Sequence, residues 1–224
     1  MENTIEIHNL TKIYQEGAEA VKALDDINLT INQGEFTAIV GPSGSGKTTL
    51  LNMIGGLDTP TSGRVVVEGI EVTRLSDNDL INFRRDNVGF VFQAYNLIPV
   101  LTAKENVTFI MDLQGVPTQK SSVRAIELLK NVGLGDRIHT RPNKLSGGQQ
   151  QRVAVARALA SKPKYILADE PTANLDGKSA ETLLDIMEKL NEEENITFIF
   201  STHDTRVMQK ARRIITLEDG KIVS

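Results

Sequence analysis

The sequence of 224 residues contains no cysteine and no tryptophan. The lack of cysteine excludes disulfides and thiolate metal sites, and it fits a reducing compartment. No apolar run approaches the ~20 residues that a transmembrane helix needs, and Met1–Leu10 lacks the basic and apolar regions of a secretory signal. We therefore expect a cytoplasmic protein that associates with the cytoplasmic face of the cell membrane only through a partner.

The sequence also lacks an excess of positive charge. Its 25 Lys and Arg residues stand against 29 Asp and Glu residues, and the net charge is −4. This balance is unlike that of a general nucleic-acid binder, so no nucleic-acid partner is expected. The length fits one domain, and we see no internal repeat or flexible linker.

A complete phosphate-binding motif is present at Gly41–Thr49 (GPSGSGKTT). It fits G-x-x-x-x-G-K-[ST] and lies between an expected buried strand, Glu35–Val40, and an expected helix, Lys47–Ile54. The glycines let the backbone turn several N–H groups toward one anion, and the helix N-terminus adds its dipole. Lys47 would contact the outer phosphates, and the Thr48 hydroxyl would ligate Mg²⁺. The alternative is a turn that only connects strand to helix.

The remaining pattern predicts an α/β core interrupted by helices. Apolar spacing between Thr102 and Lys162 is helical, so we expect a helical subdomain at about residues 102–162 inserted into a core of about residues 1–101 and 163–224. The expected strands are Ile5–Leu10, Leu24–Ile31, a hairpin over Arg64–Val72, Asn87–Phe92, Tyr165–Asp169, Thr197–Ser201, Arg213–Glu218 and Lys221–Val223. The expected later helices are Ala103–Gln114, Thr118–Asn131, Gly147–Ser161 and Lys178–Glu192.

Two carboxylates, Asp169 and Glu170, follow an apolar strand. Ligands of parallel α/β sheets bind at the carboxyl ends of the strands, and successive side chains alternate in direction. Asp169 can therefore face the Mg²⁺ held by Thr48, while Glu170 can polarise a water that attacks the γ-phosphate. The alternative is a polar strand end before the turn at Pro171.

Three further side chains have open interpretations. His203 ends a second apolar strand and would bond the γ-phosphate, unless it only packs at the surface. Gln93 follows the expected strand Asn87–Phe92. Its amide would reach Mg²⁺ or the attacking water, unless it only caps that strand. Tyr14 lies upstream of the phosphate motif and would stack on a nucleotide base or simply pack.

The segment Leu145–Gln149 (LSGGQ) predicts a second anion site. Gly147 and Gly148 expose N–H groups, Ser146 supplies a hydroxyl, and a helix begins there. Two phosphate-binding surfaces in one chain suggest a head-to-tail dimer with each ATP between two copies. The alternative is a helix capped by Ser146.

These motifs, in this order, resemble the nucleotide-binding subunits of ABC transporters over essentially the whole chain. The matching segments are GPSGSGKTT, Gln93, LSGGQ, YILADE, the ANLD segment at Ala173–Asp176, and His203. The implied fold is an ABC ATPase fold: a P-loop NTPase core with an antiparallel β subdomain and an inserted helical subdomain. The implied activity is ATP hydrolysis with Mg²⁺.

The resemblance also implies roles for matching residues. Glu170 is the catalytic base, with His203 and Gln93 beside it, and Thr48, Gln93 and Asp169 are associated with Mg²⁺. Asp176 links the two subunits' sites, although Ala173-Asn174 departs from the residues that many members have before Leu-Asp. The full implied ATP site comprises Tyr14, Gly41, Ser43, Gly44, Ser45, Gly46, Lys47, Thr48, Thr49, Gln93, Ser146, Gly147, Gly148, Gln149, Asp176 and His203.

Two longer stretches, Phe83–Val107 and NKLSGGQQQRVAVARAL, resemble the MacB, LolD and FtsE-like group. Members of that group export macrolides or peptides, extract lipoproteins, or act in cell-wall remodelling. The implied partners are a second copy of the chain and an integral membrane permease, contacted through about Gln93–Leu101. The alternatives are a non-transport ATPase that regulates a cell-envelope complex and a soluble ABC ATPase, although about fifty residues between Gln93 and Leu145 leave no room for a long coiled coil.

Overall fold

The computed structural model describes residues 3–16 and 19–223, so the outermost residues of the expected domain bounds lie outside the described part. Within that part, a six-stranded sheet has the order β10-β9-β3-β8-β7-β6. Neighbouring strands from β9 to β6 are parallel, and β10 is antiparallel to β9. The strands are β3 (Phe36–Val40), β6 (Val88–Phe92), β7 (Tyr165–Asp169), β8 (Thr197–Ser201), β9 (Arg213–Glu218) and β10 (Lys221–Ile222).

The central strands are buried because helices cover both faces of the parallel sheet. Every residue of β3 and β8 is buried. Helix α1 (Lys47–Ile54) packs on one face and α6 (Gly177–Glu194) on the other. Continuous apolar runs are typical of such strands, which is why the sequence predicted them correctly.

A second, antiparallel sheet has the order β2-β1-β4-β5. It consists of β1 (Asn3–Glu16), β2 (Glu19–Asn32), β4 (Ser62–Val67) and β5 (Ile70–Glu71). The first two strands are longer than predicted. The register shifts between Ile7 and Leu10, where Asn9 has φ 48°, so a bulge breaks the alternation that would have indicated the full strand.

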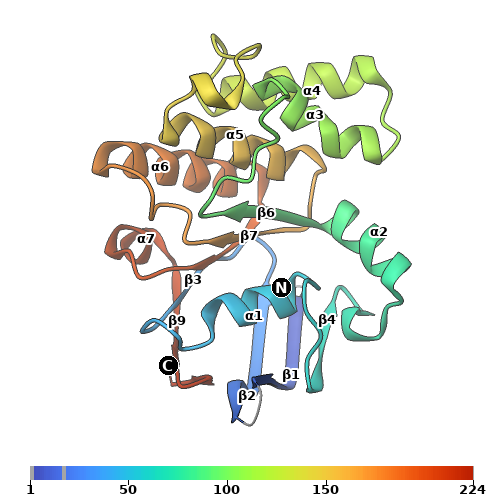
Figure 1. Cartoon of the computed structure of the whole chain (residues 1–224), viewed down its shortest axis with the longest axis vertical. Coiled ribbons are helices and arrows are strands. Elements are labelled where there is room, and N and C mark those ends of the chain that lie inside the picture. Colours follow the sequence, from blue (N-terminus) through green and yellow to red (C-terminus); the bar gives the residue numbers. More distant parts are fainter. Residues whose placement is uncertain (1–2, 17–18, 224) are drawn as a thin grey trace.

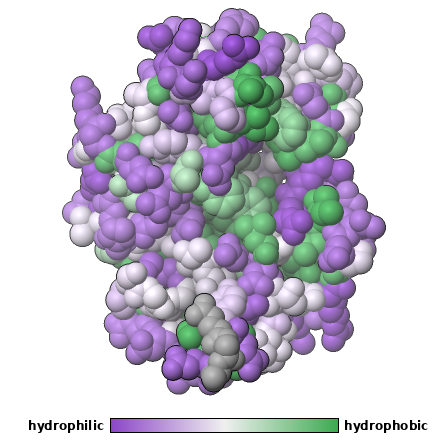
Figure 2. Space-filling view, in the orientation of Figure 1, coloured by the Kyte–Doolittle hydropathy of each residue, from purple (hydrophilic) through white to green (hydrophobic). Residues whose placement is uncertain are grey.

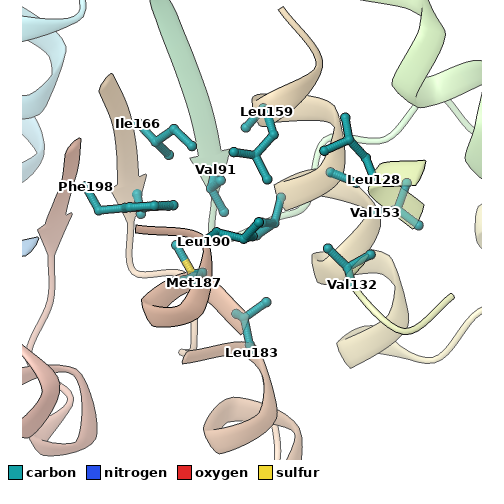
Figure 3. Packing of buried hydrophobic residues seen from close by; sticks show 14 of the residues in the cluster. Val91, Leu128, Val132, Val153, Leu159, Ile166, Leu183, Met187, Leu190 and Phe198 are labelled. Carbon is teal, nitrogen blue, oxygen red and sulfur yellow. The ribbon is translucent and has the colours of Figure 1, made fainter. Parts of the chain in front are cut away.

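Helices α3 (Ala103–Leu113), α4 (Thr118–Asn131) and α5 (Gly147–Ala160) lie at the end of the molecule opposite the antiparallel sheet (Figure 1). They agree with the predicted helices to within one residue at each end. Side chains from these helices, such as Leu128 and Leu159, meet Val91 of β6 and Met187 of α6 in one hydrophobic cluster (Figure 3). The cluster joins the helical end to the parallel sheet.

Helices α2 (Asp77–Asn87) and α7 (Thr205–Lys210) have no counterpart in the predicted elements. Each buries a single side chain, Phe83 in α2 and Val207 in α7, so neither produces an apolar periodicity. Two short 3-10 turns, Val72–Arg74 and Pro142–Lys144, complete the described elements. No described helix is long and apolar enough to span a membrane.

Candidate nucleotide site

A cavity of about 770 Å³ opens where the parallel strands end. The phosphate motif forms its floor, and residues from five other segments form its walls. Its lining residues are Val21, Lys22, Ala23, Gly41, Pro42, Ser43, Gly44, Gly46, Lys47, Thr48, Thr49, Gln93, Glu170, Ala173, Ser201, His203, Asp219 and Gly220. The topology therefore gathers most of the predicted nucleotide contacts into one hollow.

The N-terminus of α1 faces this cavity without a side-chain cap. Its N-cap residue, Gly46, has φ 103°, and a side chain there would collide with the carbonyl oxygen of Ala23. Gly41 has φ 152°, and a side chain there would collide with the carbonyl oxygen of Leu217. Both positions therefore require glycine, and the free N–H groups of the first helical turn remain for an anion.

Lys47 lies over the phosphate loop and is almost fully buried. Its Nζ donates to the carbonyl oxygens of Gly41 and Pro42, each at 2.9 Å. An ammonium group has three donors, so one N–H remains for a phosphate oxygen. Ser45 is buried and does not line the cavity, so its predicted contact to a nucleotide stays a prediction.

The Thr48 hydroxyl contacts Asp169 across 121 positions of sequence. The distances from Thr48 Oγ1 to Asp169 Oδ1 and Oδ2 are 3.0 and 3.2 Å. Asp169 ends β7, and parallel pairing places it beside Ser201 at the end of β8. The sheet thus brings together the hydroxyl and carboxylate that the sequence assigned to Mg²⁺.

Glu170 and His203 form a second pair. His203 Nδ1 lies 2.7 Å from Glu170 Oε1, and both residues line the cavity. The backbone of Glu170 has φ 46°, a left-handed conformation that costs free energy in a non-glycine residue. A hydrogen bond from its N–H to the carbonyl oxygen of Ser201, at 2.9 Å, holds this conformation. The carboxylate is thereby directed into the cavity rather than along the strand.

Gln93 lines the cavity after β6, and its carbonyl oxygen accepts from Asn174 Nδ2 at 3.0 Å. The chain beyond it is held by Arg157 of α5, which donates to the carbonyl oxygens of Tyr95 and Asn96. Burial lowers the pKa of Arg157. Gln93 is thus anchored through its backbone at the wall of the cavity.

Tyr14 does not line the cavity. It pairs in the sheet with Val21, which does, and its hydroxyl donates to Asp58 Oδ2 at 2.7 Å. The predicted base-stacking residue therefore lies at the edge of the cavity, beside its wall.

The LSGGQ segment forms a separate hollow of about 200 Å³. It is lined by Ser146, Gly148, Gln149, Arg152, Lys178, Ser179 and Thr182. Ser146 caps α5 in a reciprocal box: its Oγ accepts from the N–H of Gln149, and Gln149 Oε1 accepts from the N–H of Ser146. The predicted cap is therefore present, and the Ser146 O–H remains free to donate because the cap uses only an acceptor of that hydroxyl.

Asp176 lies outside both hollows. It caps α6, where its carboxylate accepts from the N–H and the hydroxyl of Ser179. These hydrogen bonds lower the pKa of Asp176. Within one chain it positions Ser179, which lines the LSGGQ hollow, rather than any residue of the phosphate loop.

The sequence interpretation missed several residues of the main cavity. Ser201 is fully buried, lines the cavity, and its hydroxyl has no hydrogen-bond partner among the described residues. A polar residue closing the apolar run TFIF was the available signal. Val21–Ala23 and Asp219–Gly220 also line the cavity, but their approach depends on long-range packing that no local pattern encodes.

Comparisons with known proteins agree with this geometry. The family model described as "ABC transporter" matches residues 24–173. An "Uncharacterized ABC transporter ATP-binding protein" of Thermotoga maritima is 50% identical over 222 residues, which is 99% of this chain and 94% of the relative. The MacB macrolide export ATP-binding/permease protein of Hyphomonas neptunium is 47% identical over 98% of this chain, which spans 34% of that longer protein.

A solved structure is similar over nearly the whole chain. The ATP-binding cassette MJ0796, in a dimeric post-hydrolysis state bound to ADP and Pi, matches with a TM-score of 0.91 and 47% sequence identity, covering 98% of this chain and 97% of that one. The predicted fold class is therefore confirmed. The chain belongs to the ABC transporter family, as one of its ATP-binding, ATP-hydrolysing subunits.

Proposed function

We propose that two copies of this chain close head to tail on two MgATP molecules and that hydrolysis drives a separate membrane permease. The observation that carries the proposal is the meeting of the Thr48–Asp169 contact and the Glu170–His203 pair above one phosphate-binding loop. The ADP and Pi in the dimeric MJ0796 structure support the same use of the corresponding cavity.

In this proposal Glu170 is the general base. Its carboxylate accepts a proton from the water that attacks the γ-phosphorus, while the bond from that phosphorus to the bridging oxygen of ADP breaks. His203 holds Oε1 of Glu170, while Oε2 accepts a long hydrogen bond of 3.5 Å from Thr202 Oγ1 and keeps a second lone pair to orient the water. Lys47 and the N–H groups of α1 stabilise the negative charge on the phosphates.

Thr48 and Asp169 would hold Mg²⁺, which prefers oxygen ligands and usually keeps several waters. The described residues contain no cluster of three or more His, Cys, Asp or Glu side chains that could hold a metal by themselves. One hydroxyl and one carboxylate suffice for Mg²⁺ when phosphate oxygens and waters supply the remaining ligands. Gln93, which lines the same cavity, would contact one of those waters.

The dimer is supported by the separation of the two phosphate-binding surfaces. The phosphate loop and LSGGQ line different hollows of one chain. The Ser146 hydroxyl and the N–H groups of Gly147 and Gly148 would therefore bind the γ-phosphate held by another copy. Asp176 would lie near the partner's site through its position at the start of α6.

A permease segment would dock in an apolar hollow of about 560 Å³ beside the Gln93–Leu101 segment. Figure 2 shows hydrophobic surface gathered at mid-height of this face, where β6 runs between α2 and the helices α3 and α5. Of the predicted contact segment, only Asn96 lines this hollow, and Leu97 packs against the core instead. The exposed apolar side chains that line the hollow would supply the contact: Leu57, Ile81, Phe109 and Leu113.

The direct test of the hydrolytic proposal is Glu170→Gln. The amide keeps the shape of the side chain but cannot accept the proton, so we expect ATP hydrolysis to fall at least 100-fold. Because closure precedes hydrolysis, the variant should also accumulate as an ATP-bound dimer in size-exclusion chromatography with light scattering. Glu181→Gln, an exposed change on α6, is the control. Hydrolysis at the wild-type rate by Glu170→Gln would remove Glu170 from the base role.

A further inference from the structure

Tyr14 is held by two residues outside the nucleotide motifs. Its hydroxyl donates to Asp58 Oδ2 at 2.7 Å, and Lys12 Nζ donates to Asp58 Oδ1 at 2.8 Å. The same Lys12 ammonium lies 4.7 Å from the centroid of the Tyr14 ring, in cation–π contact. One face of the ring is thus occupied by Lys12, and the hydroxyl fixes the ring's orientation.

Asp58 itself is fixed to the strand that carries Tyr14. Backbone hydrogen bonds join the turn after α1 to β1 at Thr61, whose N–H donates to the Thr11 carbonyl oxygen at 2.8 Å. The N–H of Ile13 donates to Thr61 Oγ1 at 2.9 Å, and Lys12 Nζ reaches the Thr59 carbonyl oxygen at 2.7 Å. The turn and the strand therefore act as one unit.

The charges in this cluster favour the same arrangement. Burial raises the pKa of Asp58, but hydrogen bonds from Lys12 and Tyr14 outweigh this effect and leave its pKa lowered. Burial, together with the Asp58 hydrogen bond, raises the pKa of Tyr14. The carboxylate stays ionised and the phenol stays protonated, as the donor–acceptor pair requires.

The position of the turn links this cluster to phosphate binding. Helix α1 presents its N-terminus to the phosphate cavity, and Asp58 follows its C-terminus. Thr49, on the first turn of α1, lines the cavity and lies close enough to Tyr14 to oppose the rise in its pKa. The same short helix therefore sets both the phosphate site and the position of the ring.

We propose that Asp58 and Lys12 are positioning residues that hold the Tyr14 ring as a fixed platform for the nucleotide base. They would determine the base-dependent part of nucleotide affinity, while the phosphate loop determines the rest. The proposal rests on the proposed function, because it needs ATP in the cavity, and on the stacking of the base on Tyr14 that the sequence predicts. Since Lys12 covers one face of the ring, the base would stack on the opposite face.

The test compares ATP with tripolyphosphate, which has the phosphates but no base. Dissociation constants for both are measured by competition with a fluorescent ATP analogue, for wild type, Asp58→Ala, Tyr14→Phe and Tyr14→Ala. We expect Asp58→Ala and Tyr14→Phe each to weaken ATP binding about five-fold and to leave tripolyphosphate binding unchanged. Tyr14→Phe keeps the ring and removes only its hydroxyl. It therefore tests the hydrogen bond from Tyr14 to Asp58 even if Asp58→Ala folds poorly. Asp77→Ala, an exposed carboxylate on α2, is the control.

The outcomes separate this inference from the proposed function. If Tyr14→Ala selectively weakens ATP binding but Asp58→Ala and Tyr14→Phe do not, the ring binds the base, and the positioning role of Asp58 and Lys12 is overturned. Equal loss of ATP and tripolyphosphate affinity in Asp58→Ala would also overturn it, because the effect would not depend on the base. If wild type binds ATP no more tightly than tripolyphosphate, base stacking itself fails. In the Tyr14→Ala background, Asp58→Ala should have no further effect, and a further selective loss would contradict action through the ring.

Discussion

The helix after the phosphate loop and the helix after LSGGQ begin in opposite ways. Helix α1 starts at Gly46 with no side-chain cap, above a cavity of about 770 Å³ that already contains Lys47 and Glu170. Helix α5 starts at Ser146 with a complete capping box, beside a hollow of about 200 Å³. The first helix leaves its N–H groups free for a ligand and has Lys47 and Glu170 in the same cavity. The second has its N-terminus capped by its own side chains and has anion donors without a catalytic group.

The two surfaces differ in the groups that one chain provides beside them. Beside the phosphate loop, one chain brings together the Lys47 ammonium, the Thr48–Asp169 contact and the Glu170–His203 pair, which are the groups that the proposed function uses to bind and orient a nucleotide. The LSGGQ hollow has cations at Arg152 and Lys178 but no carboxylate among its lining residues. It is suited to receive phosphates that another chain presents.

The largest effect is expected when LSGGQ is blocked and the phosphate loop is left intact. Ser146→Glu places a negative charge against the partner's γ-phosphate, and we expect ATP hydrolysis to fall roughly 100-fold, as for loss of a transition-state donor. The affinity of the monomer for ATP should stay at the wild-type value. Ser76→Glu is a matched control, because Ser76 caps α2 in the same way, away from both hollows. If Ser146→Glu also lowered the affinity of the monomer for ATP, LSGGQ would contribute to the ATP site of its own chain. That result would contradict the difference between the two helices.

A smaller effect, on ATP affinity instead of hydrolysis, is expected when the phosphate loop loses its cation. Lys47→Ala removes the ammonium that contacts the phosphates, so ATP affinity should fall about 10- to 100-fold, as for a charged hydrogen bond. Equilibrium binding by a fluorescent ATP analogue measures this directly. Lys120→Ala, an exposed change on α4, should bind normally. Unchanged affinity in Lys47→Ala would contradict the assignment of the phosphate loop.

The smallest effect concerns the capping box itself. Gln149→Ala removes one half of the α5 box and should lower the free energy of unfolding by about 0.5 to 1 kcal/mol. Glu105→Ala removes the same half of the box at α3, so it should cost a similar amount. Urea denaturation measures both. Only Gln149→Ala should also lower hydrolysis, and equal hydrolysis by the two variants would show that the α5 box serves stability alone.

Local patterns predicted the residues whose neighbours in sequence are their neighbours in space. The phosphate motif, its flanking strand and helix, and the cap at Ser146 all depend on contacts within a few residues. The carboxyl-end rule for parallel strands then placed Asp169 and Glu170 near the loop without any knowledge of the strand order.

Contacts across long stretches of sequence were beyond prediction. Tyr14 and Asp58 are 44 positions apart, and Arg157 reaches Asn96 across 61. Ser201 enters the cavity because β8 lies between β3 and β7, which no pattern within TFIFS encodes. Helix α2 was missed for a different reason, since a surface helix that buries one residue has no apolar periodicity.

A mixing experiment with two variants, assayed at an ATP concentration where neither hydrolyses ATP alone, tests directly whether two chains share each ATP site. Lys47→Ala lacks the phosphate loop's cation, and Ser146→Glu lacks a working LSGGQ turn. If each ATP lies between the loop of one chain and the LSGGQ of another, a mixed dimer contains one intact site, and mixing should restore hydrolysis to about one quarter of the wild-type rate for random two-fold pairing. No recovery on mixing, while each variant alone still forms dimers with wild type, would contradict the shared site.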